Sequence, residues 1–121
     1  MKILLVDDSN TMRRIEKNTL EKMGYTDITE AGDGLEAVAK VNGTKFDLVL
    51  MDWNMPNMTG IDALKKIKAD AATKSVPVIM VTSESEKSRI MEAIQAGAAN
   101  YVVKPFQQDT LQEKISALTK K

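Results

Sequence analysis

The chain has 121 residues, and its 17 Lys and Arg residues balance 17 Asp and Glu residues, so the formal net charge is zero. This balance argues against a broad basic surface for nucleic acid or an anionic membrane. The sequence contains neither Cys nor His, which excludes disulfides and thiolate metal sites and removes the usual general base. No apolar run approaches the ~20 residues that cross a bilayer, and the N-terminal run is too short for a signal peptide. We therefore expect a single cytoplasmic domain over residues 1–121.

Five apolar runs alternate with five helical patterns along the chain. The runs cover residues 2–6, 27–31, 47–51, 77–81 and 100–103. The first, third and fourth are nearly continuous in Val, Ile, Leu and Met, as in parallel strands that are buried on both faces. The second run alternates and is more polar, as in an edge strand. This order predicts an α/β fold with a doubly wound, five-stranded parallel sheet and five helices.

The helical patterns have apolar residues spaced by three and four positions, so each predicted helix should bury one stripe. The expected stripes are Met12/Ile15/Thr19/Met23, Leu35/Val38/Ala39, Ile61/Leu64/Ile67, Ile90/Ala93/Ile94 and Leu111/Ile115/Leu118. A glycine should follow the first, second and fourth helices as a C-terminal cap, and these glycines are Gly24, Gly43 and Gly97.

Polar side chains occur where four of the predicted strands end. Asp7 and Asp8 follow the first strand, and Asp52, Thr82 and Lys104 lie at the ends of the third, fourth and fifth. The carboxyl ends of parallel strands share one edge of the sheet, where ligands bind in α/β folds. Neighbouring carboxylates repel each other unless a proton or a cation relieves them, and Mg²⁺ prefers such oxygen ligands. The pattern therefore predicts a pocket for a divalent cation and a phosphoryl group, with an aspartate as a candidate nucleophile and Lys104 as a charge-stabilising group.

Each of these residues also has a purely structural explanation. The acidic pair could form a solvated turn that caps the next helix, helped by Ser9 or Asn10. Asp52 could be a carboxylate at the start of a loop before the turn at Pro56. A threonine at a strand end is common in turns. The combination, rather than any single residue, favours the phosphoryl site.

The ordered residues Asp7, Asp8, Asp52, Thr82 and Lys104-Pro105 resemble the receiver domains of two-component signalling, over the whole range from Lys2 to Lys121. The stretches 11–14, 52–58 and 96–106 narrow this resemblance to the single-domain chemotaxis response regulators. The resemblance implies a flavodoxin-like fold with strand order 2-1-3-4-5, an order that we take from the family rather than from spacing. It also implies a receiver domain without an output domain.

The resemblance further implies roles for the acidic residues. Asp52 would accept a phosphoryl group from the phosphohistidine of a chemotaxis histidine kinase. Asp8 and Asp52 would bind Mg²⁺ directly, together with the backbone carbonyl of Asn54, and Asp7 would act through water. Asn54 and Glu84 would also tune the rate of dephosphorylation.

The remaining implied roles concern a conformational switch. Lys104 would contact the phosphoryl group, Thr82 would donate a hydrogen bond to it, and Tyr101 would turn inward into the space that Thr82 leaves. A shift of this kind needs contacts that differ between the two states, which these donors would supply. The switched surface would bind the flagellar motor switch protein through the fourth helix, fifth strand and fifth helix, with Lys87, Ile90, Tyr101, Val103 and Lys114. Ile90 and Val103 could instead be core residues.

On this hypothesis the protein is not an enzyme with a separate substrate, because it catalyses only its own phosphoryl transfer and dephosphorylation. A phosphatase is a further candidate partner, and we expect a monomer without nucleic-acid binding or membrane insertion. One alternative is a stand-alone receiver that serves as a phosphorelay shuttle or phosphate sink, although Tyr101 favours a switch. A Mg²⁺-dependent phosphohydrolase is disfavoured, since ~121 residues leave no cap to enclose a substrate. A flavodoxin-like electron carrier is disfavoured because Asp7 and Asp8 would repel a flavin phosphate.

Overall fold

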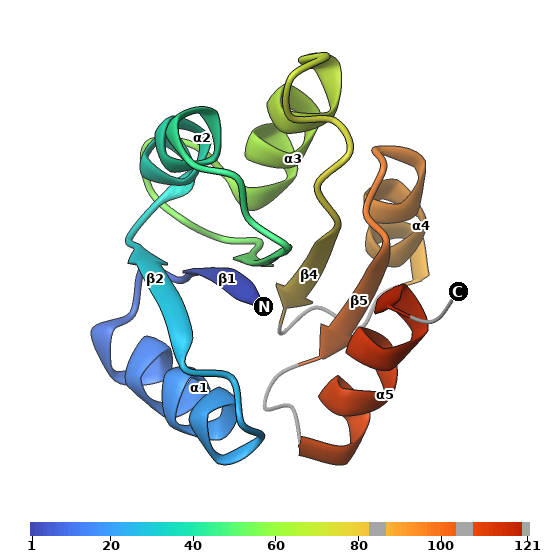
Figure 1. Ribbon diagram of the computed structural model, residues 1–121. Helices are drawn as coiled ribbons and strands as arrows, with labels where there is room; N and C mark the ends of the chain where they lie inside the picture. Colours follow the sequence, from blue (N-terminus) through green and yellow to red (C-terminus); the bar gives the residue numbers. More distant parts are fainter. Residues whose placement is uncertain (83–86, 104–107, 120–121) are drawn as a thin grey trace.

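Strands and helices alternate along the whole chain, as the sequence predicts. The computed structural model describes residues 1–82, 87–103 and 108–119. Figure 1 shows the strands β1 (Lys2–Val6), β2 (Asp27–Ala31), β3 (Leu48–Asp52), β4 (Val78–Thr82) and β5 (Asn100–Val103). The helices are α1 (Asn10–Lys22), α2 (Gly34–Gly43), α3 (Gly60–Ala69), α4 (Lys87–Gln95) and α5 (Gln108–Thr119). The third and fourth strands each begin and end one residue later than predicted.

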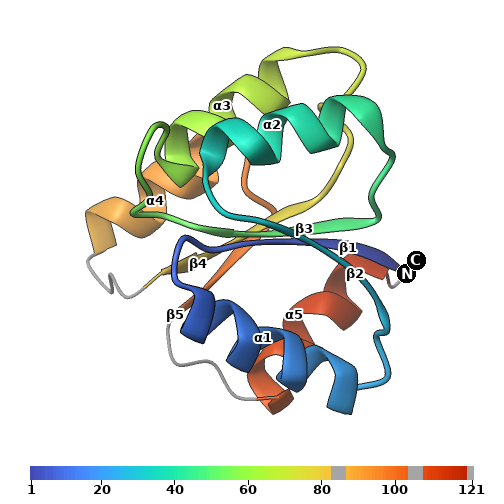
Figure 2. The ribbon, with the colours of Figure 1, turned by 90° about the vertical axis from the view of Figure 1, so that its left-hand side faces the viewer.

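The strands form one parallel sheet in the order β2-β1-β3-β4-β5, which confirms the doubly wound fold and the strand order that the resemblance implied. The polar strand β2 lies at the edge of this sheet, as predicted. Helices α1 and α5 cover one face, and α2, α3 and α4 cover the other (Figure 2). Both faces of the central strands are thus shielded from water, which explains their continuous apolar sequences.

Residues of the central strands alternate between two hydrophobic clusters, one on each face of the sheet. In β3, for example, Leu48 and Leu50 belong to the cluster that includes Leu20 of α1, whereas Val49 and Met51 belong to the cluster that includes Leu64 of α3. This alternation follows from the two-residue repeat of a strand. Packing in both clusters holds β1, β3 and β4 in place, so the residues at their carboxyl ends are well positioned.

The predicted buried stripes are correct for α3 and for α5, and wrong in part for the other helices. Ile15 in α1 and Leu35 in α2 are each 52% exposed, and Ile94 in α4 is 46% exposed. Helix α1 instead buries Leu20 and Glu16. Spacing identifies an apolar-rich face, but the packing of the whole domain decides which residues of that face are buried against the sheet.

Two of the three predicted glycine caps are confirmed. Gly24 and Gly97 have φ values of 96° and 108°, a left-handed conformation that glycine adopts without a steric penalty. After α4, the N–H groups of Gly97 and Ala98 donate to the carbonyls of Ile94 and Ala93, as in a Schellman motif. The prediction for Gly43 is wrong, because Gly43 is the last residue inside α2.

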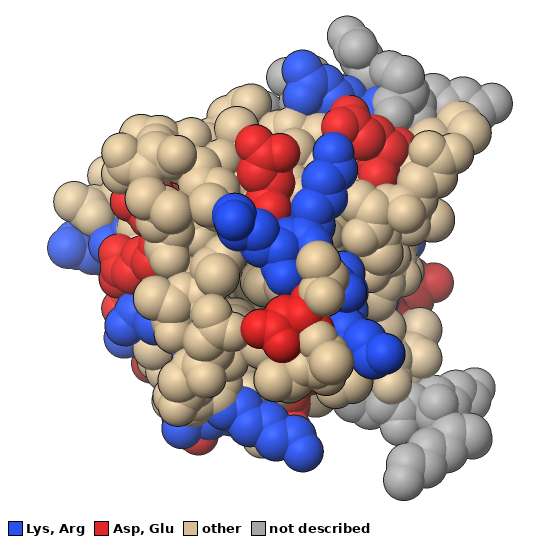
Figure 3. All heavy atoms as spheres, turned by 90° about the horizontal axis from the view of Figure 1, so that it is seen from above, with Lys and Arg blue, Asp and Glu red and all other residues tan. Residues whose placement is uncertain are grey.

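The outer helical surface carries mixed charges. Figure 3 shows Lys and Arg side chains interspersed with Asp and Glu over the face that α2 and α3 cover. This pattern agrees with the zero net charge and shows no single-sign field on that face. In the part of the chain that the structure describes, no helix has the length and apolarity needed to cross a membrane.

Candidate functional site

The register of the sheet brings the predicted carboxylates together. Val6 in β1 pairs with Met51 in β3, so the next residues, Asp7 and Asp52, emerge side by side at the carboxyl edge. One carboxylate oxygen from each of Asp7, Asp8 and Asp52 lies within 4.8 Å of the other two. The sequence-based prediction of a three-carboxylate cluster is therefore confirmed.

The three carboxylates differ in their access to water. Asp7 and Asp52 are buried, at 1% and 8% exposure, whereas Asp8 is exposed. Hydrogen bonds orient the buried pair, because the Ser9 N–H donates to Asp7 Oδ1 (2.9 Å) and the Trp53 N–H donates to Asp52 Oδ1 (2.8 Å). Gathering like charges in a partly desolvated place costs free energy unless a cation or proton offsets it. The cluster is therefore suited to a cation that enters from the side of Asp8.

The turn after β1 also begins α1. Ser9 is the N-cap of that helix, and its Oγ accepts a hydrogen bond from the Met12 N–H (3.2 Å). The capping explanation for this turn is thus correct for Ser9, and the acidic cluster forms as well. The two explanations are compatible because Ser9 caps the helix while Asp7 and Asp8 lie at the edge of the sheet.

Arg13 of α1 holds the turn that carries the acidic pair, a role that the sequence analysis did not identify. Its Nη1 donates to the Asp7 carbonyl (2.6 Å), its Nη2 to Asn10 Oδ1 (2.7 Å) and its Nε to Glu30 Oε1 in β2 (2.9 Å). The planar guanidinium can make these bonds at once, which an ammonium group cannot match. The available signal was a cationic residue near the start of the helix that follows the acidic pair.

The electrostatic environment of Glu30 reflects this network. Partial burial by itself would raise the pKa of Glu30, but the hydrogen bond from Arg13 and the positive charges of Lys17 and Arg13 outweigh it and lower the pKa. Lys17 Nζ lies 3.5 Å from Glu30 Oε2. Glu30 therefore remains ionised to lower pH than an isolated glutamate and keeps its partner Arg13 in place.

The β3–α3 loop, residues 53–59, carries Asn54, the predicted donor of a backbone carbonyl. Asn54 is exposed, whereas Trp53 beside it is 3% exposed. The loop closes tightly, because the Gly60 N–H donates to the Trp53 carbonyl (2.8 Å). A Cβ added to Gly60 would overlap the Asp52 carbonyl oxygen, so only glycine lets α3 begin this close to β3.

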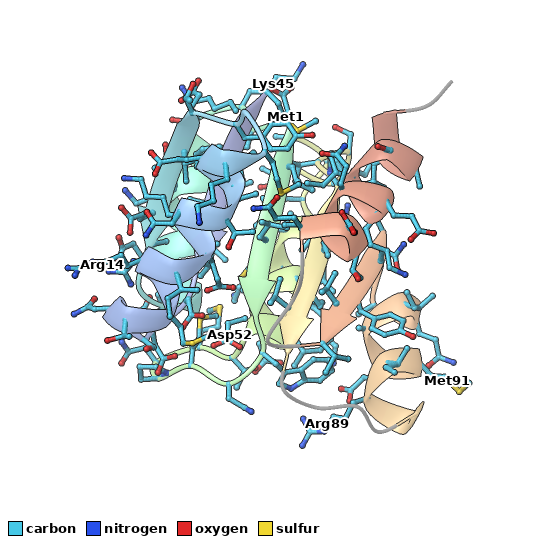
Figure 4. All side chains as sticks on the ribbon, turned by 90° about the horizontal axis from the view of Figure 1, so that it is seen from below. Met1, Arg14, Lys45, Asp52, Arg89 and Met91 are labelled. Carbon is cyan, nitrogen blue, oxygen red and sulfur yellow. The ribbon has the colours of Figure 1, made fainter. Side chains whose placement is uncertain are left out.

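Arg89 of α4 is a second neighbour of the site that the sequence analysis did not identify. Its guanidinium carbon lies 5.2 Å from the centre of the Trp53 ring, a cation–π arrangement. Figure 4 shows Asp52 and Arg89 toward the same end of the molecule, whereas Met1 and Lys45 lie at the opposite end. The contact links α4 to the residue that follows Asp52.

Four other predicted positions are placed only in part or lie outside the described residues. Thr82 is described as the last backbone position of β4, paired with Val103, and Lys87 as the first residue of α4. Lys104 and Glu84 lie outside the described residues. The roles predicted for these four residues therefore stay predictions.

The predicted partner surface lies on neighbouring elements. Tyr101 is half-buried and packs against the core, and Lys114 Nζ of α5 lies 5.5 Å from the centre of its ring. Val103 is 36% exposed, and Ile90 is half-buried. Neither Ile90 nor Val103 is fully enclosed in the core, so both can contribute to a surface.

A cavity of about 490 Å³ lies between the α2–β3 and α3–β4 connections, lined by residues that include Thr44, Phe46 and Pro77. Since these connections precede β3 and β4, the cavity is at the amino ends of the strands, away from Asp52. A smaller depression of about 190 Å³ adjoins the acidic cluster and is lined in part by Asp8, Arg13 and Glu30. The larger cavity is therefore separate from the carboxylates.

A five-stranded parallel sheet in this order, covered by helices on both faces, defines a doubly wound α/β domain, and here three aspartates lie at its carboxyl edge. The model for the response regulator receiver domain matches residues 3–116, and the chain belongs to that family. Among known proteins it is similar to the chemotaxis protein CheY of Pseudomonas aeruginosa, with 51% identity over 118 residues that span 98% of this chain and 95% of the relative. The chemotaxis protein CheY-3 of Vibrio cholerae is also 51% identical, over 98% of this chain and 91% of the relative.

Solved structures give the same result. CheY4 of Vibrio cholerae matches with a TM-score of 0.87 and 36% identity over 97% of each chain. The receiver domain of the sensor histidine kinase PA1611 from Pseudomonas aeruginosa matches with a TM-score of 0.88 and 30% identity, covering 97% of this chain and 95% of that one. That structure has a magnesium ion coordinated in its active-site cleft. The chain is thus a receiver domain closely related to the CheY chemotaxis regulators.

Proposed function

We propose that this protein is a cytoplasmic chemotaxis response regulator that accepts a phosphoryl group on Asp52 from a histidine kinase. The observation that carries this proposal is the cluster of Asp7, Asp8 and Asp52 within 4.8 Å at the carboxyl edge of a CheY-like sheet. Receiver domains typically bind Mg²⁺, and the donor set fits that ion because it consists of hard oxygen ligands. Asp7, Asp8, Asp52 and the backbone carbonyl of Asn54 would hold it.

The chemistry of the proposed reaction follows from the residues at the cluster. A carboxylate oxygen of Asp52 attacks the phosphorus, an oxygen–phosphorus bond forms, and the phosphorus–nitrogen bond of the donor phosphohistidine breaks with its electron pair going to the imidazole. Mg²⁺, when bound, neutralises charge on the carboxylates and the phosphoryl oxygens. The Trp53 N–H orients the Asp52 carboxylate, and Arg13 holds the turn that carries Asp7 and Asp8. We assign Thr82 and Lys104 as phosphoryl contacts from the family pattern.

The output we propose is binding to the flagellar motor switch protein through α4, β5 and α5. The contact between Lys114 and Tyr101, together with the partial exposure of Val103, supports a surface at this place. A protein of this kind catalyses only its own phosphoryl transfer and dephosphorylation. Capture from a lysate of the source cell, with the beryllofluoride form as bait, should recover a motor switch component. Recovery of histidine phosphotransfer proteins alone would favour the shuttle or sink.

Phosphorylation itself has a direct test. We expect incubation with acetyl phosphate and Mg²⁺ to add one phosphoryl group to the wild-type protein, seen by intact-mass spectrometry, and none to Asp52→Asn. Asp47→Asn is a matched control, because Asp47 is exposed and accepts a bond from the Lys2 N–H at the far edge of the sheet. Labelling of Asp52→Asn at the wild-type level would show that Asp52 is not the acceptor.

A further inference from the structure

The β3–α3 loop, residues 53–59, is tied to the start of α2 by a side-chain hydrogen bond. Asn57 Nδ2 donates to Asp33 Oδ2 at 2.8 Å. The other oxygen of Asp33, Oδ1, accepts from the Glu36 N–H at 2.8 Å and caps α2. Asp33 thus serves two elements at once, and we call its hydrogen bond with Asn57 the loop clasp.

Asn57 adopts an uncommon backbone conformation to make the clasp. Its φ is 66°, and it is the one non-glycine residue with positive φ in the described ranges 1–82, 87–103 and 108–119. Asparagine tolerates this left-handed conformation better than most residues, but glycine adopts it more readily. A residue held in such a conformation requires compensating contacts, and such residues concentrate at functional sites.

The backbone of the loop also lies directly on α2. A Cβ added to Gly34 would overlap the Met58 carbonyl oxygen and would lie 3.0 Å from the Met58 carbonyl carbon. At its other end the loop is closed by the Gly60 N–H bond to the Trp53 carbonyl. The clasp and these two close approaches fix the segment that contains Asn54, three residues before Asn57.

We propose that Asn57 and Asp33 are positioning residues for metal binding, because their clasp holds the loop in the conformation in which Asn54 can act as a backbone ligand. This inference rests on the proposed function, since it assumes that the acidic cluster binds Mg²⁺. Removing the clasp should leave the three carboxylates intact and weaken Mg²⁺ binding through the loop alone. The loop must then be ordered at the moment of binding, which lowers affinity.

The test uses two variants that each remove one partner of the clasp and keep the local backbone. Asn57→Gly deletes the donor and retains easy access to positive φ. Asp33→Ser deletes the second acceptor and retains a good N-cap for α2. We expect each variant to raise the Mg²⁺ dissociation constant about three- to tenfold, which is the change that the loss of one hydrogen bond typically produces. The double variant should bind no more weakly than the weaker single variant, because both changes break the same bond.

Isothermal titration calorimetry measures the dissociation constants, and thermal unfolding in EDTA measures stability without the metal. Glu36→Gln is the charge control, because it removes one negative charge near Asp33 and keeps an acceptor for the Gly32 N–H (3.2 Å). Wild-type affinity in both single variants would overturn the inference and leave the proposed function intact. An effect of Glu36→Gln equal to that of Asp33→Ser would also overturn it. If the wild-type protein itself bound no Mg²⁺, both the inference and the proposed metal site would fail.

Discussion

Substitution of Gly60 by Ala should damage the site by steric overlap alone. The added Cβ would overlap the Asp52 carbonyl oxygen and would lie 2.9 Å from the Asp52 carbonyl carbon and 3.1 Å from Met51 Cγ. Since carbon atoms normally pack at about 3.5–4.0 Å, the start of α3 and the end of β3 must separate by roughly 1 Å. The two Asp52 atoms belong to the backbone at the end of β3, so rotation of a side chain cannot relieve the overlap with them.

Overpacking of this kind lowers the free energy of unfolding by about 1–3 kcal/mol. For a domain of this size, a loss of about 2 kcal/mol lowers the unfolding temperature by roughly 6–12 °C. A displacement of roughly 1 Å at Asp52 should also slow labelling by acetyl phosphate, by up to about 100-fold. Circular dichroism during heating and a labelling time course measure the two effects.

Gly43→Ala provides the matched control. It makes the same chemical change inside α2, where an added Cβ meets no atom within 4 Å. Alanine is favoured over glycine in the middle of a helix by about 0.5–1 kcal/mol, and Gly43 is the last residue of α2, so this variant should unfold at the wild-type temperature or slightly above it. The steric reasoning would be wrong if Gly60→Ala were as stable as the wild-type protein or as Gly43→Ala.

Three further predictions concern the metal, pH and packing. Trp53 lies beside Asp52, so its fluorescence should change on titration with millimolar Mg²⁺, and an unchanged spectrum would count against the site. Because the pKa of Glu30 is lowered in the fold, Glu30 stabilises the protein above its unfolded pKa of 4.5, and this contribution is lost as pH falls through the lower folded value. Glu30→Gln should therefore lower the free energy of unfolding, measured with urea, by about 0.2–1 kcal/mol at pH 7 and by less at pH 3. An equal loss at the two pH values would refute the link between the lowered pKa and stability. Leu64→Ala should lower the free energy of unfolding by about 2–5 kcal/mol, because Leu64 is fully buried. Leu35→Ala, at a half-exposed position, should lower it by under about 1 kcal/mol, and similar losses in the two variants would contradict the observed burial.

Much of the fold and the acidic cluster could be predicted from the sequence. The continuous apolar runs of β1, β3 and β4 identify parallel strands with two covered faces, and an aspartate at a strand end must lie at the carboxyl edge. The strand order could not be predicted in this way, because nothing in the spacing of the runs shows which strands are neighbours. It came from the resemblance to receiver domains.

Tertiary structure alone decided the contacts between segments that are distant in the sequence. The pairing of Val6 with Met51 places Asp7 beside Asp52, and no local pattern encodes that register. The bonds from Arg13 to Glu30 and from Asn57 to Asp33 join residues 17 and 24 positions apart. Local sequence determines periodicity and strand ends because these depend on neighbouring side chains. Helix orientation, as at the exposed Ile15, and the contacts that hold the site depend on the packing of the whole domain.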